Sequence, residues 1–189
     1  DILARKQDHL DVVLQQDVGF GQLTTGFEHI RFVHNALPEL NLEDIDLSAS
    51  LFGTKLKAPI LMSSMTGGPV HAAKINRHLA EAAQELGIAF AVGSQRVALE
   101  GKGEFGIDAN IRQYASNSVI LGNIGGAQIS QTSGVEMAKR AIEMIEANGI
   151  YVHLNPLQEA VQSGGNTDWR GVLHGIELLC KEGLNVAVK

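Results

Sequence analysis

The sequence contains little of several residue types, and each scarcity narrows the kind of protein that it encodes. One cysteine, Cys180, occurs in 189 residues. This excludes an internal disulfide framework and is typical of a reducing compartment, so we expect a cytoplasmic protein. Cys180 continues a helical apolar stripe that contains Val172, Ile176 and Leu179, which predicts a buried thiol. No apolar run reaches the length of a membrane span and no signal peptide is visible, so we expect no membrane partner.

Positive charge is also scarce. Lys and Arg number 15 against 21 Asp and Glu, and the formal net charge is −6. No basic run and no interleaving of basic with aromatic residues occurs, so we expect no nucleic-acid partner. The 44% hydrophobic content is that of an ordinary globular protein with a substantial core. A small anionic ligand remains compatible with this charge, because a local group of Arg and Lys can outweigh the mildly acidic whole.

A repeat begins at residue 59. Short apolar runs typical of buried strands recur roughly every 30 residues, and each interval contains one helical pattern. Glycine lies at three helix-to-strand joins, where it can adopt the left-handed conformation that ends a helix. Repeated strand–helix units with short turns predict a parallel α/β sheet that is covered on both faces. The predicted strands begin at Ile60, Ile88, Val119, Ile150 and Leu184, and the glycines are Gly87, Gly149 and Gly183.

The five repeated units favour a (β/α)8 TIM barrel, which has eight such units in about 250 residues. A parallel sheet that stopped at Lys189 would leave a bare edge. We therefore predict that the chain holds about the first five strand units of a longer barrel. Residues 1–58 would form a lead-in or capping segment with a short amphipathic helix near Val12, and residues 59–189 the barrel part. The alternative is a five-stranded doubly wound sheet that is complete in itself.

The run from Tyr151 to Glu159 is the most informative stretch. Apolar and polar residues alternate through residues 150–155, which predicts a strand that Pro156 ends. His153 and Asn155 share one strand face, and Gln158 and Glu159 follow at the C-terminal end, where parallel sheets bind ligands. A single carboxylate suits an Mg²⁺ ion that also binds substrate phosphate. The alternative is a strand end whose polar side chains are satisfied within the protein.

Other predicted strands also end in polar or flexible residues, and parallel strands bring these ends together on one rim. Gly67 and Gly68 allow a close backbone approach to a ring or a phosphate. The Arg96 guanidinium suits a phosphate, and a Lys189 cation would stabilise a reduced, anionic flavin. Taken singly, each residue could be a turn residue or a surface charge. The full set is Met65, Thr66, Gly67, Ser94, Gln95, Arg96, Asn123, His153, Asn155 and Lys189.

Six segments resemble a known family in the right order along the chain. The sequence is similar to the type 2 isopentenyl diphosphate isomerases, which are FMN-dependent (β/α)8 barrels. The resemblance runs from residue 5 to residue 189, and the pattern His-x-Asn-x-x-Gln-Glu is its most specific part. The segments are Arg5-Lys6 with His9, residues 32–39, residues 65–68, residues 93–96, residues 122–125 and residues 153–159.

The resemblance implies an activity and cofactors. The reaction would interconvert isopentenyl and dimethylallyl diphosphate in isoprenoid biosynthesis, without net redox change, with reduced FMN as the acid and base through N5. NADPH or NADH would serve only to reduce the flavin. The small-molecule diphosphate would be the partner of a homotetramer or larger homo-oligomer. The family's FMN-phosphate loops follow strands after the fifth and are absent from this sequence.

The resemblance also implies residue roles. His153 and Gln158 would support catalysis. Glu159 would bind Mg²⁺. FMN would be contacted by Met65, Thr66, Gly67, Ser94, Asn123 and Lys189. The substrate would be held by Arg5, Lys6, Ser94, Gln95, Arg96, His153, Asn155 and Gln158.

Two other functions remain open on the same fold, because the barrel supports many chemistries. An FMN-dependent 2-hydroxy-acid oxidoreductase would transfer a hydride and would have no reason to keep Glu159 as a metal ligand. A non-catalytic half-barrel that binds flavin or phosphate would hold its ligand without turnover.

Overall fold

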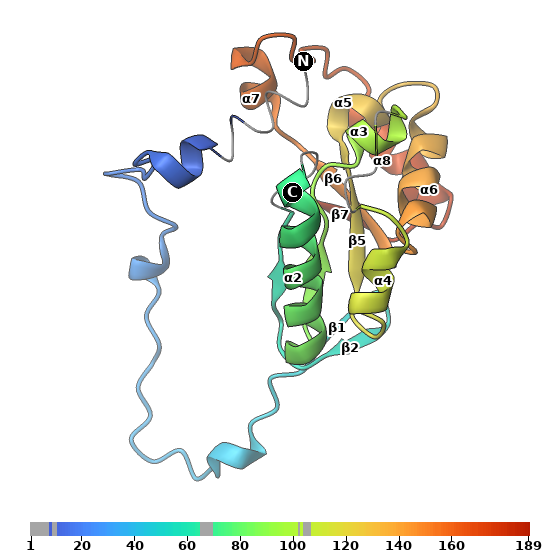
Figure 1. Cartoon of the computed structure of the whole chain (residues 1–189). Coiled ribbons are helices and arrows are strands. Elements are labelled where there is room, and N and C mark those ends of the chain that lie inside the picture. The colour runs from blue at the N-terminus through green and yellow to red at the C-terminus, as the bar shows by residue number, and fades with distance from the viewer. Residues whose placement is uncertain (1–7, 9–10, 65–69, 102, 104–106) are drawn as a thin grey trace.

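A five-stranded parallel sheet lies at the centre of the protein (Figure 1), of which a computed structural model describes residues 8, 11–64, 70–101, 103 and 107–189. Its strands pair in chain order, so the sheet has no topological switch point. This order makes the doubly wound alternative wrong and leaves a curled parallel half-barrel. The strands are β3 (Leu61–Met62), β4 (Ala89–Ala91), β5 (Ile120–Gly125), β6 (Gly149–His153) and β7 (Val186–Val188).

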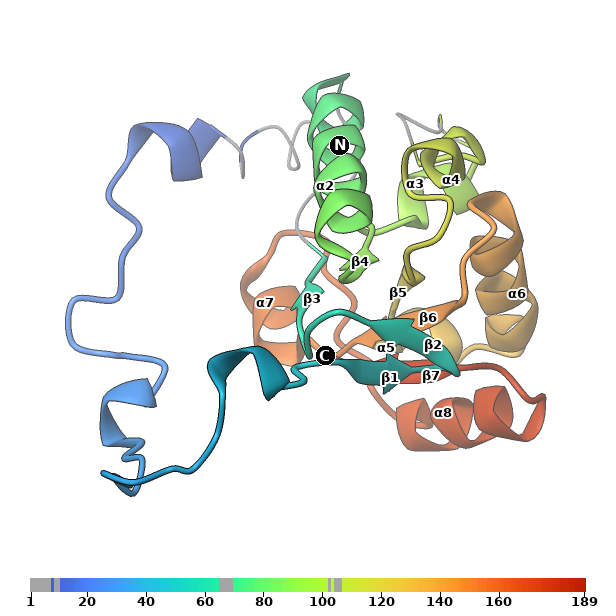
Figure 2. The same ribbon diagram turned by 90° about the horizontal axis from the view of Figure 1, so that it is seen from below.

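Helices cover the convex face of the sheet (Figures 1 and 2). The longer ones are α2 (Val70–Leu86), α6 (Gly134–Met144) and α8 (Val172–Lys181), and α4 (Asn110–Tyr114) packs beside α2. Short helices follow three of the strand ends: α3 (Arg96–Leu99), α5 (Gly126–Ile129) and α7 (Pro156–Val161). The prediction of one helix in each interval is therefore wrong after β4, β5 and β6, because four to six residues are too few to show a helical period.

The strands alternate between two apolar layers. Phe90, Ile120 and Val152 face the helices and are fully buried. Ala91 and Leu121 face the concave side with their neighbours. The same alternation continues towards the C-terminal ends of the strands, where polar residues replace apolar ones on the concave face. Those residues are Asn123, His153 and Lys189.

A hairpin closes the opposite end of the concave face. Strands β1 (Ala49–Leu51) and β2 (Thr54–Leu56) are antiparallel and joined by Phe52 and Gly53, both with positive φ. Two such residues make the tight turn whose twist suits a hairpin. Leu56 is 5% exposed and packs into the concave layer. The hairpin lies inside the predicted lead-in segment, whose boundary at residue 58 stays a prediction.

Residues 11–48 form an arm that extends away from the sheet (Figures 1 and 2). Residues 11–15 are helical, which confirms the predicted short helix there. Two 3₁₀ turns follow, η1 (Phe27–His29) and η2 (Leu42–Asp44). Phe32 and Val33 are 95% and 97% exposed. The capping role that we predicted for this segment stays a prediction.

The glycines at the helix ends separate into two kinds. Gly87 and Gly183 have φ of 64° and 76° after α2 and α8, as predicted. Gly149 is different, because the left-handed turn before it is made by Glu146 at φ 50°. Gly149 begins β6, where a Cβ would lie 2.6 Å from the carbonyl oxygen of Asn185. Glycine is therefore required at position 149 because the neighbouring strand packs closely there, and not because a helix ends there.

Cys180 is exposed, so the prediction of a buried thiol is wrong. The buried positions of α8 are Val172, Gly175 and Leu179. The buried stripe is narrower than the apolar pattern suggests, and Cys180 lies just outside it. In the described part of the chain, no helix combines the length and the apolar character needed to cross a membrane.

Candidate functional site at the C-terminal ends of the strands

Two buried side-chain oxygen atoms at this end of the sheet have no hydrogen-bond partner among the described residues. Asn123 is 3% exposed, and its Nδ2 donates to the carbonyl oxygen of Val92 at 3.3 Å, but its Oδ1 accepts no hydrogen bond from the part of the chain that the structure describes. Ser64, two residues past β3, is 6% exposed, and its Oγ likewise has no partner within residues 8, 11–64, 70–101, 103 and 107–189. Buried polar atoms are nearly always hydrogen-bonded. These two therefore indicate a ligand that presents hydrogen-bonding groups to them.

Lys189 crosses the concave face of the half-barrel. Its Nζ donates to the carbonyl oxygen of Ser64 at 2.8 Å, joining the ends of the two edge strands. Its backbone N–H donates to Val152 at 3.0 Å and its carbonyl accepts from Leu154 at 2.8 Å. Burial lowers the pKa of the Lys189 ammonium. A partly desolvated cation held in this way suits an electron-rich or anionic ring.

His153 lies on the same concave face and is half-buried. Its pKa is lowered, first by burial and then by the positive charge of Lys189, while Glu159 acts in the opposite direction. The folded protein therefore favours the neutral imidazole near neutral pH. A neutral ring can both donate and accept a hydrogen bond.

We expect His153 to titrate below its usual pKa of 6.5. Because the unfolded chain binds the proton more readily, the stability that neutral His153 confers is present above about pH 6.5 and is lost as pH falls through the folded pKa. Lys189→Met should move the midpoint part of the way back up, since burial remains. NMR titration of the ring protons measures this. Lys139→Met, on the outer face, is the control and should leave the His153 midpoint unchanged. If Lys189→Met also left the midpoint unchanged, Lys189 would have no effect on the pKa of His153.

The polar run after β6 forms one hydrogen-bonded group at the start of α7. Asn155 Nδ2 donates to Gln158 Oε1 and to Glu159 Oε1, both at 3.2 Å. Glu159 Oε2 accepts the backbone N–H of Asn166 at 2.7 Å. The structure thus brings Asn155, Gln158 and Glu159 together, as predicted from their spacing.

This group fits a divalent cation of a particular kind. Among the described residues, no cluster of three or more His, Cys, Asp or Glu side chains is placed to hold a metal. Glu159 would therefore bind the ion without a cage of further His, Cys, Asp or Glu ligands. Mg²⁺ is commonly bound in this way, through one or two carboxylates together with substrate phosphate and water. An ion that needs an all-protein cage would not fit.

The run after β4 separates into residues with different surroundings. Ser94 Oγ accepts the Arg96 backbone N–H at 3.4 Å, and the Arg96 guanidinium pairs with Glu100, just past α3, at 2.8 Å. Gln95 is fully buried; its Nε2 donates to the Ala141 carbonyl at 2.8 Å, and its Oε1 accepts the Asn123 N–H at 2.8 Å. The Gln95 side chain is thus directed towards α6 and is not brought to the rim with the others.

Five predicted site residues lie outside the described residues: Arg5, Lys6, Met65, Thr66 and Gly67. The sequence reasoning missed Ser64 and Asn166. Ser64 directly precedes the predicted run at residue 65, so its place at a strand end was the available signal. Asn166 contributes its backbone N–H, which no residue type reveals.

Comparison with known proteins places the chain among flavoproteins. The family model described as FMN-dependent dehydrogenase matches residues 3–100, just over half of the chain. The chain belongs to the FMN-dependent dehydrogenase family. This family assignment supports the use of FMN. It agrees with the two buried oxygens of Ser64 and Asn123 and with Lys189 on the concave face.

Curated relatives of this FMN-dependent dehydrogenase family member carry a more specific name. It is 57% identical over 178 residues to a protein named isopentenyl-diphosphate delta-isomerase from Stutzerimonas stutzeri. It is 55% identical to one of that name from Cronobacter sakazakii and 44% identical to one from a Nostoc species. These matches cover 94%, 94% and 95% of this chain but 51% of each relative. The chain spans about half the length of the curated relatives it matches.

Proposed function

We propose that this chain carries the flavin- and diphosphate-binding part of a type 2, FMN-dependent isopentenyl diphosphate isomerase on a (β/α)8 barrel. The observation that carries the proposal is the 57% identity to a protein named isopentenyl-diphosphate delta-isomerase over 94% of the chain. The likeness is thus not confined to one motif. The half-barrel agrees with it, because five consecutive parallel strands with outer helices are part of such a barrel.

The concave face would hold the flavin ring. Lys189 would lie near its electron-rich edge, and Asn123 Oδ1 would accept a hydrogen bond from it. Met65, Thr66, Gly67 and Ser94 would complete the contacts from the neighbouring strand ends. When bound, reduced FMN would supply the acid and the base for the double-bond shift, after reduction by NADPH or NADH.

The substrate diphosphate would bind at the rim. Mg²⁺ on Glu159 would neutralise it together with Arg5, Lys6 and Arg96, because two phosphates require several charged hydrogen-bond donors. Arg96 would exchange its contact with Glu100 for one with phosphate. Ser94 and Gln158 would add neutral contacts, and Gln95 would act from behind by fixing the Asn123 backbone.

The reaction needs little from the side chains except position and exclusion of water. One proton is added at the terminal alkene carbon and another is lost two carbons away, so electrons and atoms balance without net oxidation. A neutral His153 would not repel the positive charge that develops on the substrate, and it would not compete with the flavin as a proton donor. Gln158 would help to orient the diphosphate. We further propose that the enzyme is cytoplasmic and that it assembles as a homotetramer or a larger homo-oligomer.

The full-length protein tests the proposal directly. It is incubated anaerobically with FMN, Mg²⁺, isopentenyl diphosphate and NADPH at a concentration well below that of substrate, and dimethylallyl diphosphate is assayed. We expect product in large molar excess over the NADPH supplied. Absence of product, with bound and reduced flavin verified by its absorbance, would refute the isomerase.

A 2-hydroxy-acid oxidoreductase is the second candidate, because the matching family is described as a dehydrogenase. It predicts oxidation of a 2-hydroxy acid in proportion to the electron acceptor added, and no requirement for Mg²⁺. The same preparation distinguishes the two activities when the substrate is exchanged.

A further inference from the structure

The loop between α7 and α8, residues 162–171, packs against Glu159 more closely than a surface loop requires. A Cβ placed on Gly165 would lie 1.9 Å from the Glu159 carbonyl oxygen. Gly164 has φ of 69°, a conformation that favours glycine. The two glycines let the chain turn back onto α7. The next residue then points its N–H at the Glu159 carboxylate, with a distance of 2.7 Å from Asn166 N to Oε2.

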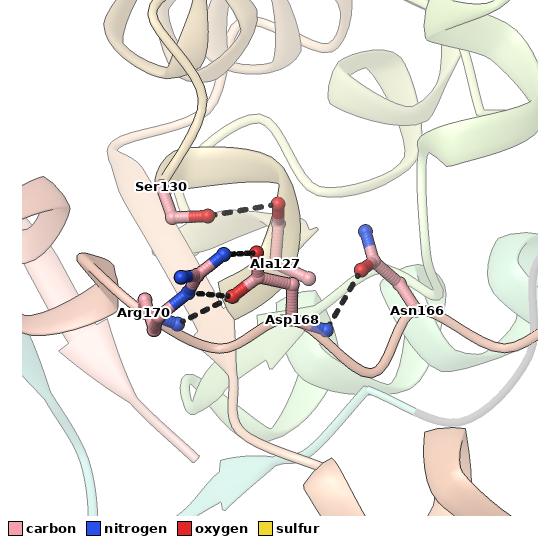
Figure 3. A network of polar contacts seen from close by, with 5 residues as sticks. All are labelled: Ala127, Ser130, Asn166, Asp168 and Arg170. Atoms are coloured by element: carbon pink, nitrogen blue, oxygen red, sulfur yellow. Dashed lines mark hydrogen bonds and ion pairs between the residues drawn. The ribbon is translucent and has the colours of Figure 1, made fainter.

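The far end of the same loop is anchored to the core. The indole Nε1 of Trp169 donates to the Asn166 carbonyl at 3.0 Å, and its ring packs into the apolar layer beneath α5 and α8. Asn166 Oδ1 accepts the Asp168 N–H at 3.3 Å (Figure 3). Arg170 Nε donates to the Asp168 carboxylate at 2.9 Å and holds the pKa of that carboxyl at about 2. Contacts from Asp168 and Trp169 to the side chain and the carbonyl of Asn166 thus hold this residue in place, and with it the direction of its N–H.

Glu159 is oriented from the other side by Asn155. The Asn155 amide donates to Oε1, while the loop donates to Oε2, so each carboxylate oxygen receives one hydrogen bond. Each oxygen keeps a further lone pair. Donors of this kind hold a carboxylate in place for a metal ion, and their loss typically weakens metal binding.

We propose that Asn155 and the loop of residues 162–171 are positioning elements for Glu159, with Asn155 acting through the carboxylate instead of contacting the substrate. Gly165 sets the loop distance and Trp169 anchors it. The inference rests on the proposed function only in that Glu159 binds the divalent cation. It concerns binding of that cation and order in the loop, neither of which requires turnover.

The test uses the full-length FMN-loaded protein with inorganic pyrophosphate, which supplies the diphosphate without an alkene. Titration calorimetry gives the Kd for Mg²⁺, and hydrogen–deuterium exchange reports the peptides that cover residues 162–171. We expect Gly165→Ala and Asn155→Ala each to weaken Mg²⁺ binding about 10–100-fold. The Kd for FMN should stay unchanged. Gly165→Ala should also speed exchange in the loop.

Thr167→Ala is the matched control, because Thr167 is exposed in the same loop. It should leave both measurements unchanged. Asn155→Ala alters no backbone, so it decides the test if Gly165→Ala fails to fold. An Mg²⁺ Kd within about twofold of wild type in Asn155→Ala overturns the inference. Glu159→Gln separates the two failures: if it also leaves the Kd unchanged, the cation site itself is wrong, whether or not the isomerase assay gives product.

Discussion

Glu159→Gln is expected to lower kcat/KM for isopentenyl diphosphate by roughly 10²–10³-fold, the loss typical of removing one preorganised charge-stabilising group. The reason is specific to this site. Within the described residues no group of three or more His, Cys, Asp or Glu side chains could hold the ion, so a neutral amide at position 159 removes the carboxylate on which the proposed site depends. The amide is nearly isosteric, so packing around α7 is preserved. Steady-state kinetics across a range of Mg²⁺ concentrations measure the effect.

Glu85→Gln provides the control for a change of one charge. Glu85 is exposed on α2, and its substitution should leave kcat/KM within about twofold, as for an ordinary surface position. FMN content should be equal in both variants. If Glu159→Gln retained activity within threefold of wild type at limiting Mg²⁺, Glu159 could not be the metal ligand.

Arg112→Ala is expected to destabilise the fold by about 3 kcal/mol, the scale of losing several charge-assisted hydrogen bonds at a half-buried position. Arg112 lies on α4, at the end of the sheet opposite the site. Its Nη1 donates to the carbonyls of Ala115 and Ser118, and its Nη2 to Asn148 Oδ1 at 2.9 Å. Asn148 Oδ1 in turn accepts the Ile120 N–H at 2.9 Å. One guanidinium thus joins the segments that lead into β5 and β6.

No carboxylate accepts from Arg112 among the hydrogen bonds of the described residues, and burial lowers the pKa of its guanidinium. Urea unfolding should show a midpoint lower by roughly 1 M, given a typical dependence on denaturant for a domain of this size. Arg112→Lys should recover only part of the loss, since an ammonium cannot reproduce the fork. The exposed Arg170→Ala is the control. Equal midpoints for Arg112→Ala and Arg170→Ala would show that the network contributes nothing.

The repeated elements were predictable because they depend on the period of apolar residues. Strands β3 to β7 follow from short apolar runs typical of strands buried on both faces, and helix α2 follows from an apolar stripe on one face. The left-handed glycines after α2 and α8 follow from the positive φ that ends a helix. The rim could be located for the same reason: residues just past parallel strands must converge. Asn123, His153 and Lys189 therefore appear on the concave face from strand parity alone.

What the sequence could not supply is the partner of each polar group. Gln95 and Arg96 are adjacent and polar, yet Gln95 faces α6 in the core and Arg96 pairs with Glu100. Nothing in the two residue types distinguishes these outcomes, because they depend on which way the chain turns after β4. The Asn166 N–H is a backbone group and has no signature at all. Cys180 was predicted to be buried because it follows Leu179 in the apolar pattern, but on α8 it lies just outside the buried stripe of Val172, Gly175 and Leu179.

The lysine that crosses the concave face has a consequence for the lifetime of the protein. Lys189 keeps a partly desolvated ammonium that no acidic side chain neutralises among the ion pairs of the described residues. Until an anionic ligand binds beside it, this unpaired charge lowers the free energy of unfolding. Ligand binding then adds stability by mass action, by an amount that rises with the logarithm of the ligand concentration above Kd. A cell short of flavin should therefore degrade this protein faster, so its abundance would follow the supply of its own cofactor.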